Sequence, residues 1–450
     1  GDVLVSMTRP NLNAVALVPT SLQGSIGSTG FHVLRSKLID PKWLHFLVQT
    51  TGFVEAMSSL VQGALYPAVR PKDIRSYRIP IAPLPEQKRI VAEIEKQFTR
   101  LDAGVEALKR LQTHLKRYRA SVLKAACEGK LVPTEAELAR KEGRDYEPAD
   151  KLLKRILKER RAKWEADQLA KMKAAGKTPK DDRWKAKYKE PARVDERPAT
   201  PLPEGWTWAK WSQIGFSQNG RPFPSSEYQD VGVKLLRPGN LHVSGLVRWD
   251  ADNTRCLPEH FAGENPDLLI AGGELVMNLT AQSLKDEFLG RVCVTGDGER
   301  CLLNQRLARL MPVGVSERFC LWMLKSWSFR RFVDGLNKGS LIQHMFTSQL
   351  DNFVVALPPA KEQLRIVSEV EKRVSTIAQV EDAIRNGIRR ASRLRQSILK
   401  RAFEGKLVPQ DPNDESASDL LERIRASAAN RPDKAAKPRS PKSKSKTAAI

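Results

Sequence analysis

Two long stretches of the chain carry apolar residues at alternating steps of three and four. The first stretch holds Ile90, Ile94, Phe98, Leu101, Val105, Leu108, Leu111, Leu115, Tyr118 and Val122. Such spacing predicts a long helix with the apolar seam of a coiled coil. The second stretch keeps this seam at Ile366, Val370, Val374 and Ile377, places Glu381 and Gly387 at seam positions, and resumes at Leu394 and Ile398. Two seams favour an antiparallel pair of helices, although each helix could instead cover its own domain.

The two predicted helices are copies of one sequence. Residues 86–133 and 362–409 align without a gap at an offset of 276 and share 21 of 48 residues, including the string "EGKLVP" that ends both. Pro85 suits the start of the first helix, and Gly129 suits its C-terminal cap. Each helix would have about 43 residues and a length of roughly 64 Å. An internal duplication therefore organises the chain.

A mixed α/β domain is predicted before the second helix. The stretch "ERFCLWMLKSWSFRRFVDGL" predicts one amphipathic helix, and Gly and Pro separate the strand-like runs "VKLLRP", "GELVMNL", "GRVCVT" and "ARLMPV". Before the first helix, "GDVLVSMT" (Gly1–Thr8) parallels "GELVMNLT" (Gly273–Thr280). No part of the first domain corresponds to Pro201–Gly272. We therefore expect a first domain that lacks this part, in a chain whose native start is missing.

The formal net charge of +24 suggests a polyanionic partner. Much of this charge lies in two stretches: residues 154–193 hold fifteen Lys and Arg against six Asp and Glu, and residues 431–446 hold seven against one. Such runs are also typical of solvated linkers, so nucleic-acid contact and simple solvation both stay open. Five cysteines stand singly without a CxxC pair, which predicts a reducing cytoplasm and no zinc site. No apolar run is long enough to span a membrane.

The order of domain, long helix, basic linker, domain, long helix and basic tail resembles the specificity (S) subunit of type I restriction–modification systems. The most specific marks are the helix starts Leu84–Val91 and Pro358–Val367, the two "EGKLVP" ends, and "LPEGW" at Leu202–Trp206. The resemblance implies two α/β (α+β) target recognition domains joined by an antiparallel pair of long coiled-coil helices. The predicted parts are the first target recognition domain (C-terminal part only, 1–85), the first central long helix (86–133), a charged linker (134–200), the second target recognition domain (201–360), the second central long helix (361–410) and a basic flexible tail (411–450).

The resemblance also implies the partners of the chain. They are double-stranded DNA with a bipartite target, methyltransferase (M) subunits and restriction/translocase (R) subunits, in the cytoplasm and without a membrane. In that family, S-adenosylmethionine, ATP and Mg²⁺ belong to the partner subunits. We therefore expect no cofactor on this chain and no catalytic activity of its own.

Sequence signals for an enzyme are incomplete. Gly176–Thr178 reads "GKT", but Lys171 stands where a phosphate-binding loop needs its first glycine. The triplets "EGK" at Glu128–Lys130 and Glu404–Lys406 match half of a nuclease motif, without the upstream acid that would share Mg²⁺ with them. Asn265-Pro266 is followed by Asp267 rather than by the second proline and the aromatic residue of an adenine methyltransferase. A stand-alone nuclease or methyltransferase, and a coiled-coil scaffold without DNA, are the alternatives.

Polar residues in predicted loops are candidates for DNA contacts. Arg reads guanine, Asn and Gln read adenine, and Lys, Arg and small hydroxyls hold phosphates. The candidates in the first domain are Thr8, Arg9, Asn11 and Asn13; those in the second are Arg237, Asn240, Asn278, Thr280, Gln282, Ser283, Lys285, Asn304, Gln305 and Arg306. Each could also be an ordinary exposed loop residue. Trp206, Trp208 and Trp211 could stack on bases, but their alternating spacing beside a turn favours the core or a subunit contact.

Overall fold

The computed structural model describes residues 1–61, 67–179, 181–195, 198–282, 287–336 and 343–429. The chain forms two compact units, one of Gly1–Leu111 with the segment from Asp382 onward, the other of Gln112–Glu381. Both boundaries lie inside the long helices, so each unit contains part of each helix. The domain limits given above, which separate helices from domains, remain predictions. Within the described residues, no helix combines the length and the apolar character that a membrane crossing requires.

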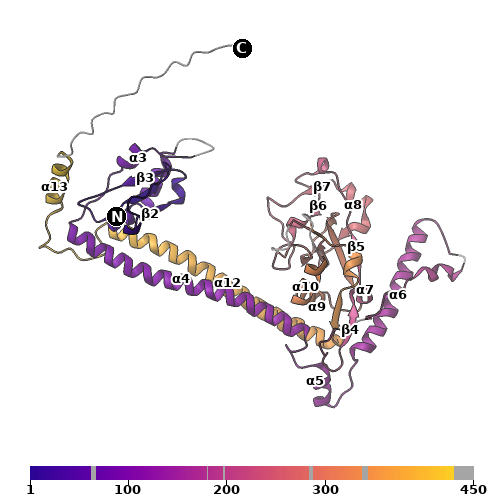
Figure 1. The fold of residues 1–450 in the computed structure, drawn as a ribbon. Coiled ribbons are helices and arrows are strands. Elements are labelled where there is room, and N and C mark those ends of the chain that lie inside the picture. The colour runs from indigo at the N-terminus through magenta and orange to yellow at the C-terminus, as the bar shows by residue number, and fades with distance from the viewer. Residues whose placement is uncertain (62–66, 180, 196–197, 283–286, 337–342, 430–450) are drawn as a thin grey trace, which may run out of the picture. The chain divides into compact units, whose positions relative to one another are not determined.

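Among the described residues, the first unit contains a small sheet, four shorter α-helices, and parts of both long helices (Figure 1). Its elements are β1 (Val3–Ser6), β2 (Val15–Leu17), β3 (Phe31–Leu34), α1 (Pro41–Leu47), α2 (Thr51–Ser59), α3 (Pro71–Arg75), the N-terminal part of α4 (Leu84–Cys127), the C-terminal part of α12 (Ala360–Phe403), and α13 (Ala417–Ala429). The strands are antiparallel in the order β2-β1-β3. Their core side chains include Val3, Val5, Phe53 and Met57.

The second unit contains a mixed α/β domain. Its helices are the rest of α4 and α12, α5 (Glu135–Glu142), α6 (Ala149–Ala174), α7 (Trp211–Ile214), α8 (His260–Glu264), α9 (Glu317–Met323), α10 (Trp327–Leu336) and α11 (Thr347–Leu350). Its strands are β4 (Thr207–Lys210), β5 (Gly215–Asn219), β6 (Val233–Leu236), β7 (Cys256–Leu257), β8 (Leu269–Ile270), β9 (Leu275–Asn278), β10 (Thr280–Ala281), β11 (Val292–Val294), β12 (Cys301–Leu303), β13 (Leu307–Pro312), β14 (Gln343–His344) and β15 (Val354–Leu357).

Two four-stranded sheets organise this domain. One has the antiparallel order β11-β9-β13-β5, and the other the order β7-β6-β12-β8, with β12 parallel to β6. The four strand-like runs of the sequence are β6, β9, β11 and β13, as predicted. The prediction of one helix over residues 317–336 is wrong. Two helices form because the Ser326 hydroxyl accepts a hydrogen bond from the Phe329 backbone N–H (3.4 Å) and so begins α10 separately.

The prediction of two long helices is confirmed, since α4 and α12 have 44 residues each. Gly129 and Gly405 follow them with left-handed φ values of 65° and 70°. The next residue returns a backbone hydrogen bond to the last turn in both copies, from Lys130 to Ala125 and from Lys406 to Arg401, each of 2.8 Å. The repeated "EGK" therefore closes each helix with a glycine-based cap.

The two long helices run antiparallel and pack on each other within each unit. In the first unit, Ile90 and Ile94 near the start of α4 share a core with Ile398 and Leu399 near the end of α12. In the second unit, Val122 and Leu123 share a core with Ile366 and Val370. These pairings confirm the predicted antiparallel arrangement.

Each interruption of the second seam has a matching residue on α4. Arg119 pairs with Glu381 at 3.2 Å. A Cβ atom at Gly387 would lie 3.0 Å from the Leu108 side chain, so glycine lets that leucine approach the backbone of α12. The helices therefore stay paired at both positions.

Candidate nucleic-acid interface

Loops at one edge of the second unit bring several predicted DNA-contacting residues together. Strands β6 and β12 are parallel and end side by side at Leu236 and Leu303. Arg237 and Asn304 are the next residues, and the Asn304 backbone N–H donates to the Leu236 carbonyl (3.2 Å). Because the carboxyl ends of parallel strands meet at one edge, Arg237 and the loop that follows β12 open onto the same side of the domain.

The loop that follows β12 carries exposed side chains. Gln305 and Arg306 are exposed, while Asn304 is buried and accepts a hydrogen bond from the Arg306 backbone N–H (3.2 Å). The Gln305 backbone N–H donates to the Arg221 carbonyl (2.8 Å), which places the turn after β5 beside this loop. The side chain of Arg221 is 61% exposed, so this edge presents two exposed arginines and an amide.

A second loop joins the same edge. The Leu279 backbone N–H donates to the Arg306 carbonyl (2.9 Å), and Thr280 follows it in β10. Thr280 pairs with His344 of β14, and the Thr280 hydroxyl lies 3.3 Å from the His344 Nδ1 atom. Gln282 is exposed just beyond β10. Ser283 and Lys285 lie outside the described residues.

Two of the predicted DNA contacts have their amides engaged inside the protein. Asn240 is fully buried, accepts from the Arg237 backbone N–H (2.9 Å) and donates to the Asn253 side chain (3.0 Å). Asn278 is also fully buried and donates to the carbonyls of Thr280 (2.8 Å) and Phe288 (2.9 Å). These amides hold the loops in shape, and neither faces solvent, because their donors and acceptors satisfy buried backbone groups.

The first unit repeats part of this arrangement. Thr8 forms an antiparallel bridge with Ala68, which corresponds to the pairing of Thr280 with His344 in the second unit. Thr8, Arg9 and Asn11 are exposed, and Asn13 donates to the Gln49 carbonyl (3.4 Å). Arg9 has a left-handed backbone with φ 48° and ψ 60°, a strained conformation for a residue with a side chain.

Sequence reasoning missed Arg221 and His344. Arg221 follows "QNG", a turn signal after a strand, and that signal could have identified it. Nothing local distinguishes His344 from the other histidines, because its position depends on pairing with a strand 63 residues earlier.

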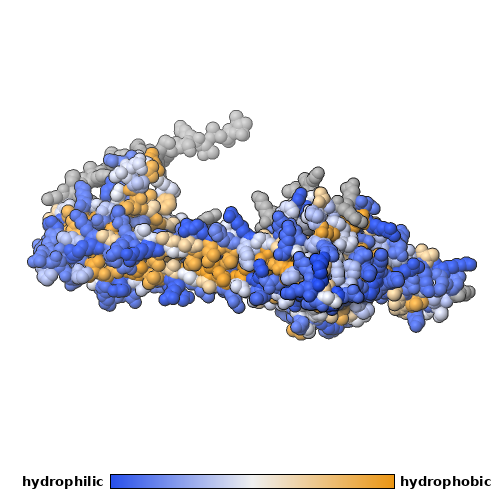
Figure 2. Space-filling view, turned by 90° about the horizontal axis from the view of Figure 1, so that it is seen from below, coloured by the Kyte–Doolittle hydropathy of each residue, from blue (hydrophilic) through white to orange (hydrophobic). Residues whose placement is uncertain are grey.

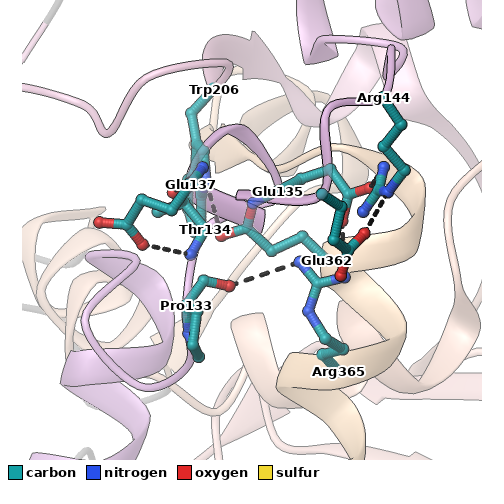
Figure 3. A network of polar contacts seen from close by, with 9 residues as sticks. Pro133, Thr134, Glu135, Glu137, Arg144, Trp206, Glu362 and Arg365 are labelled. Atoms are coloured by element: carbon teal, nitrogen blue, oxygen red, sulfur yellow. Dashed lines mark hydrogen bonds and ion pairs between the residues drawn. The ribbon is translucent and has the colours of Figure 1, made fainter. Parts of the chain in front are cut away.

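A buried polar network joins three sequence motifs at the start of α12 (Figure 3). The Glu362 carboxylate accepts from the Trp206 Nε1–H (2.9 Å) and from the Glu135 backbone N–H (2.8 Å). The Glu135 carboxylate in turn accepts from Arg144 (2.7 Å) and Arg365 (2.6 Å). "LPEGW", the segment after "EGKLVP", and the "EQ" helix start thus meet at one junction that ties the recognition domain to the helices.

The two buried carboxyls of this network have opposite pKa shifts. Burial raises the pKa of Glu362 above its usual value. Burial alone would also raise the pKa of Glu135, but hydrogen bonds from Arg144 and Arg365, and their charges, outweigh it and hold that pKa below the usual value. The ion pairs of Glu135 therefore stabilise its charged form, while Glu362 relies on neutral N–H donors.

The remaining motif residues are structural. Trp206 and Trp211 are buried in the core, which is one of the two positions that their spacing in the sequence favoured. In each "EGK" triplet the lysine pairs with the glutamate two residues earlier, at 2.8 Å for Lys130 with Glu128 and 2.9 Å for Lys406 with Glu404. Both triplets belong to helix ends.

The fold and the site define a duplicated protein whose long paired helices carry mixed α/β domains with polar and basic loops. No family model matches the chain. It is 26% identical over 426 residues to the type I restriction enzyme EcoAI specificity subunit of Escherichia coli, covering 84% of this chain and 67% of that protein. It is 24% identical over 411 residues to the EcoKI specificity subunit of Escherichia coli strain K12, covering 88% and 74%.

A solved structure shares the fold. It concerns complex assembly and conformational transition of the type I R-M system, and superposes with a TM-score of 0.62 at 22% identity, covering 90% of this chain and 82% of the other. The curated homologues of this chain are type I restriction enzyme specificity subunits, which confirms the resemblance that its motifs indicated.

Proposed function

We propose that this chain is the DNA sequence-specificity subunit of a type I restriction–modification complex and reads a bipartite double-stranded target, one part with each unit. The observation that carries the proposal is the homology to specificity subunits over most of the chain. The exposed Arg221, Gln305 and Arg306 at the edge where β6 and β12 end support it. Arginine and amide side chains are the groups that discriminate base edges in the major groove.

We also propose that the long helices dock methyltransferase subunits. Apolar residues gather on the surface of α4 and α12 (Figure 2). Leu111 and Leu394 are 42% and 48% exposed in the first unit, and Tyr118 and Leu364 are 45% and 63% exposed in the second. Exposed apolar side chains on a charged helix pair are typical of a protein interface. Restriction/translocase subunits would join the same complex.

Catalysis belongs, in this proposal, to the partner subunits, which would bind S-adenosylmethionine, ATP and Mg²⁺. The chain itself would bind none of them and would work beside cellular DNA in the cytoplasm, where its five free cysteines suit a reducing environment. Purified chain should therefore neither cleave nor methylate DNA. Turnover by rigorously purified chain with Mg²⁺ or a methyl donor would favour the alternative of a stand-alone enzyme.

The decisive experiment maps methylated bases in DNA from cells that express the chain with its methyltransferase and restriction partners. The expected result is methylation at one bipartite sequence. Arg306→Ala and Arg221→Ala should relax the discrimination between bases at the positions read by the second unit. Each substitution should cost about 1–3 kcal/mol of DNA-binding free energy.

The matched control for these substitutions is Arg300→Ala. The side chain of Arg300 is 50% exposed, but Arg300 precedes β12 and lies at the opposite end of the parallel strands. Its substitution should leave the methylated sequence unchanged. Absence of any salt-dependent DNA binding by the assembled complex would instead favour a scaffold without DNA.

A further inference from the structure

The charged stretch of residues 154–193 forms a folded arm. It holds fifteen Lys and Arg against six Asp and Glu. The structure describes all of it except residue 180, and it contains most of α6 together with the 3₁₀ helix η3 (Asp182–Lys187). The stretch belongs to the second unit, and the C-terminal part of α6 stands away from the sheets of that unit (Figure 1). We call residues 154–193 the basic arm.

The beginning of the basic arm is anchored in the α/β domain. Ile156 is fully buried in the main core of the second unit. The Arg160 guanidinium donates to the Gly215 carbonyl (2.7 Å) and lies over the Phe216 ring, 3.6 Å from its centroid. Gly215 and Phe216 begin β5, and Arg221 follows the end of the same strand. The arm is therefore fixed to a strand that leads to the proposed DNA-reading edge.

Aromatic side chains fold the later part of the arm back on α6. Trp184 is 9% exposed and stacks on Trp164, with 6.1 Å between the ring centroids and 22° between the ring planes. The Tyr188 ring lies 5.3 Å from the same Trp164 ring. An aromatic pair stabilises a fold by about 0.5–1.5 kcal/mol beyond the burial of its area. A solvated spacer needs no such cluster, so the arm has a defined shape that serves a contact.

Ion pairs inside the arm use its arginines and leave most of its lysines free. Five of the six acidic residues pair internally: Glu159 with Arg155, Glu165 and Glu190 with Arg161, Asp181 with Arg183, and Asp182 with Lys185. Six lysines are exposed and form no ion pair among the described residues: Lys158, Lys163, Lys171, Lys173, Lys177 and Lys187. The surplus positive charge of the arm therefore lies on exposed ammonium groups.

Exposed lysines on a folded arm suit phosphate groups better than base edges. An ammonium group is a compact point charge and lacks the planar fork with which arginine reads guanine. Duplex DNA carries one negative charge per about 1.7 Å of its axis. From Lys158 to Lys173, α6 extends over roughly 22 Å, so several phosphates can meet it at once. An acidic protein could also attract lysines, but the same unit already carries the proposed DNA-reading edge.

We propose that the basic arm binds the phosphate backbone of double-stranded DNA outside the bases that the second unit reads, without regard to sequence. This inference rests on the proposed function, which brings DNA to the second unit. The arm would supply affinity, and the loops at the ends of β6 and β12 would supply discrimination. Loss of charge on the arm should therefore weaken target and non-target DNA by the same factor.

The test measures how salt changes the affinity of the full chain for non-target DNA. A fluorescent duplex of scrambled sequence, about 30 base pairs long, is titrated at salt concentrations between about 50 and 200 mM. The variant combines Lys158→Gln, Lys163→Gln, Lys171→Gln and Lys173→Gln. The slope of log K against log salt should become shallower by about 2–4, because each phosphate contact contributes about 0.9. Affinity at the lowest salt should fall about tenfold or more.

The matched control removes the same charge elsewhere on the second unit. Four of its lysines outside the arm are exposed and form no ion pair among the described residues: Lys116, Lys141, Lys361 and Lys372. Changing these four to Gln should alter the slope by less than about 1. An equal change of slope in both variants would assign the binding to net charge and would overturn the proposal. Failure of the unaltered chain to bind the duplex at low salt would do the same.

Trp184→Ala tests whether the arm acts as a folded element. The substitution keeps every charge and removes the ring that stacks on Trp164. Hydrogen exchange should become faster in residues 181–190 while the rest of the second unit stays protected, and affinity for the duplex should fall. Unchanged affinity in a variant with faster exchange would show that the lysines act as a loose charged chain, which contradicts the folded arm.

Methylation mapping separates this proposal from the proposed function. The four-lysine variant of the arm, expressed with the partner subunits, should methylate the same bipartite sequence as the unaltered chain. A changed sequence would place these lysines in base readout and would overturn the arm proposal. So would an unchanged salt slope combined with loss of methyltransferase subunits in sedimentation, because the arm would then bind an acidic protein. If the unaltered chain directs no methylation at all, the proposed function fails, while the salt slope on non-target DNA still tests the arm.

Discussion

The helix start "EQ" serves the two copies differently, and the difference separates the roles of its two residues. Gln363 accepts from the Ser316 backbone N–H (3.2 Å) and donates to the Pro358 carbonyl (3.0 Å). Gln87 repeats this with Asp40 (2.9 Å) and Ala82 (2.8 Å), at the same offset. The glutamine therefore depends only on the part of the domain that both copies possess.

The glutamate of the second copy depends on the segment that opens its domain and on the segment that follows α4. Glu362 is held by Trp206 and by the segment after α4, whereas Glu86 has neither partner among the described residues. The arginine three residues after the glutamate has an acidic partner in both copies, but not an equivalent one. Arg365 pairs with Glu135 at 2.6 Å, and Arg89 pairs with Asp414 at 2.6 Å. One repeated motif thus combines a residue that holds the domain, one that holds the opening segment in the second copy, and one that pairs with the segment after the other long helix.

Loss of Trp206 should have the largest effect on this comparison. Trp206→Ala empties a buried site beside Gly129 and leaves Glu362 without a side-chain donor. We expect a loss of about 3–5 kcal/mol in the stability of the second unit. Hydrogen exchange resolved by segment is the measurement, because a chain with two units need not unfold in one step.

Trp208→Ala is the matched control for this substitution. Trp208 lies two residues further along and is only partly buried, so its loss should cost clearly less. Equal losses for both tryptophans would show that neither the deeper burial of Trp206 nor its bond to Glu362 gives it a special part in the junction.

The helices, their ends and the alternation of strands could be predicted from the sequence, because seam spacing, capping glycines and apolar runs are local signals. The antiparallel pairing could also be predicted, because two matching seams have few ways to pack. The inward orientation of Asn240 and Asn278 could not, since it depends on carbonyls from distant turns. The break between α9 and α10 rests on one serine that a periodicity count passes over.

Removing the two equivalent glutamates should give unequal losses. Glu362→Ala leaves the Trp206 N–H and the Glu135 backbone N–H without an acceptor, and we expect a loss of about 2–3 kcal/mol. Glu86→Ala removes no hydrogen bond among the described residues and should cost about 1 kcal/mol or less. Protection of each unit against hydrogen exchange measures both. A large loss from Glu86→Ala would mean that its carboxylate already has a partner in solution.

The two carboxyls of the network should respond to pH in opposite directions. The folded pKa of Glu362 is raised, so the folded state binds more protons and stability falls as pH rises from about 4.5 through the folded pKa. The folded pKa of Glu135 is lowered, so its contribution is present above about 4.5 and is lost as pH falls through the folded pKa.

Stability measured against pH for Glu362→Gln and Glu135→Gln tests these signs. Relative to the unaltered chain, Glu362→Gln should gain as pH rises from 4 to 7, because a neutral amide avoids the burial of charge. Glu135→Gln should lose relative to the unaltered chain as pH rises toward about 4.5, because the unaltered chain there gains the ion pairs of the Glu135 carboxylate with Arg144 and Arg365. Parallel slopes for the two variants would contradict the assignment of charge within the network.

The smallest expected effect concerns the seam, where the first copy has Leu111 and the second has Gly387. Alanine is favoured over glycine inside a helix by roughly 0.5–1 kcal/mol, so Gly387→Ala should stabilise the first unit by up to that amount. The new Cβ atom would lie 3.0 Å from Leu108, and the terminal methyl group must move by a few tenths of an ångström. Leu108 is only partly buried and can rotate.

Combining Gly387→Ala with Leu108→Ala separates the two contributions, because the second substitution removes the crowding while the gain in helix propensity is kept. Slower hydrogen exchange in α12 is the expected readout. Faster exchange in the single variant that the Leu108→Ala change reverses would show that close packing at Gly387, rather than helix propensity, decides how these helices pair.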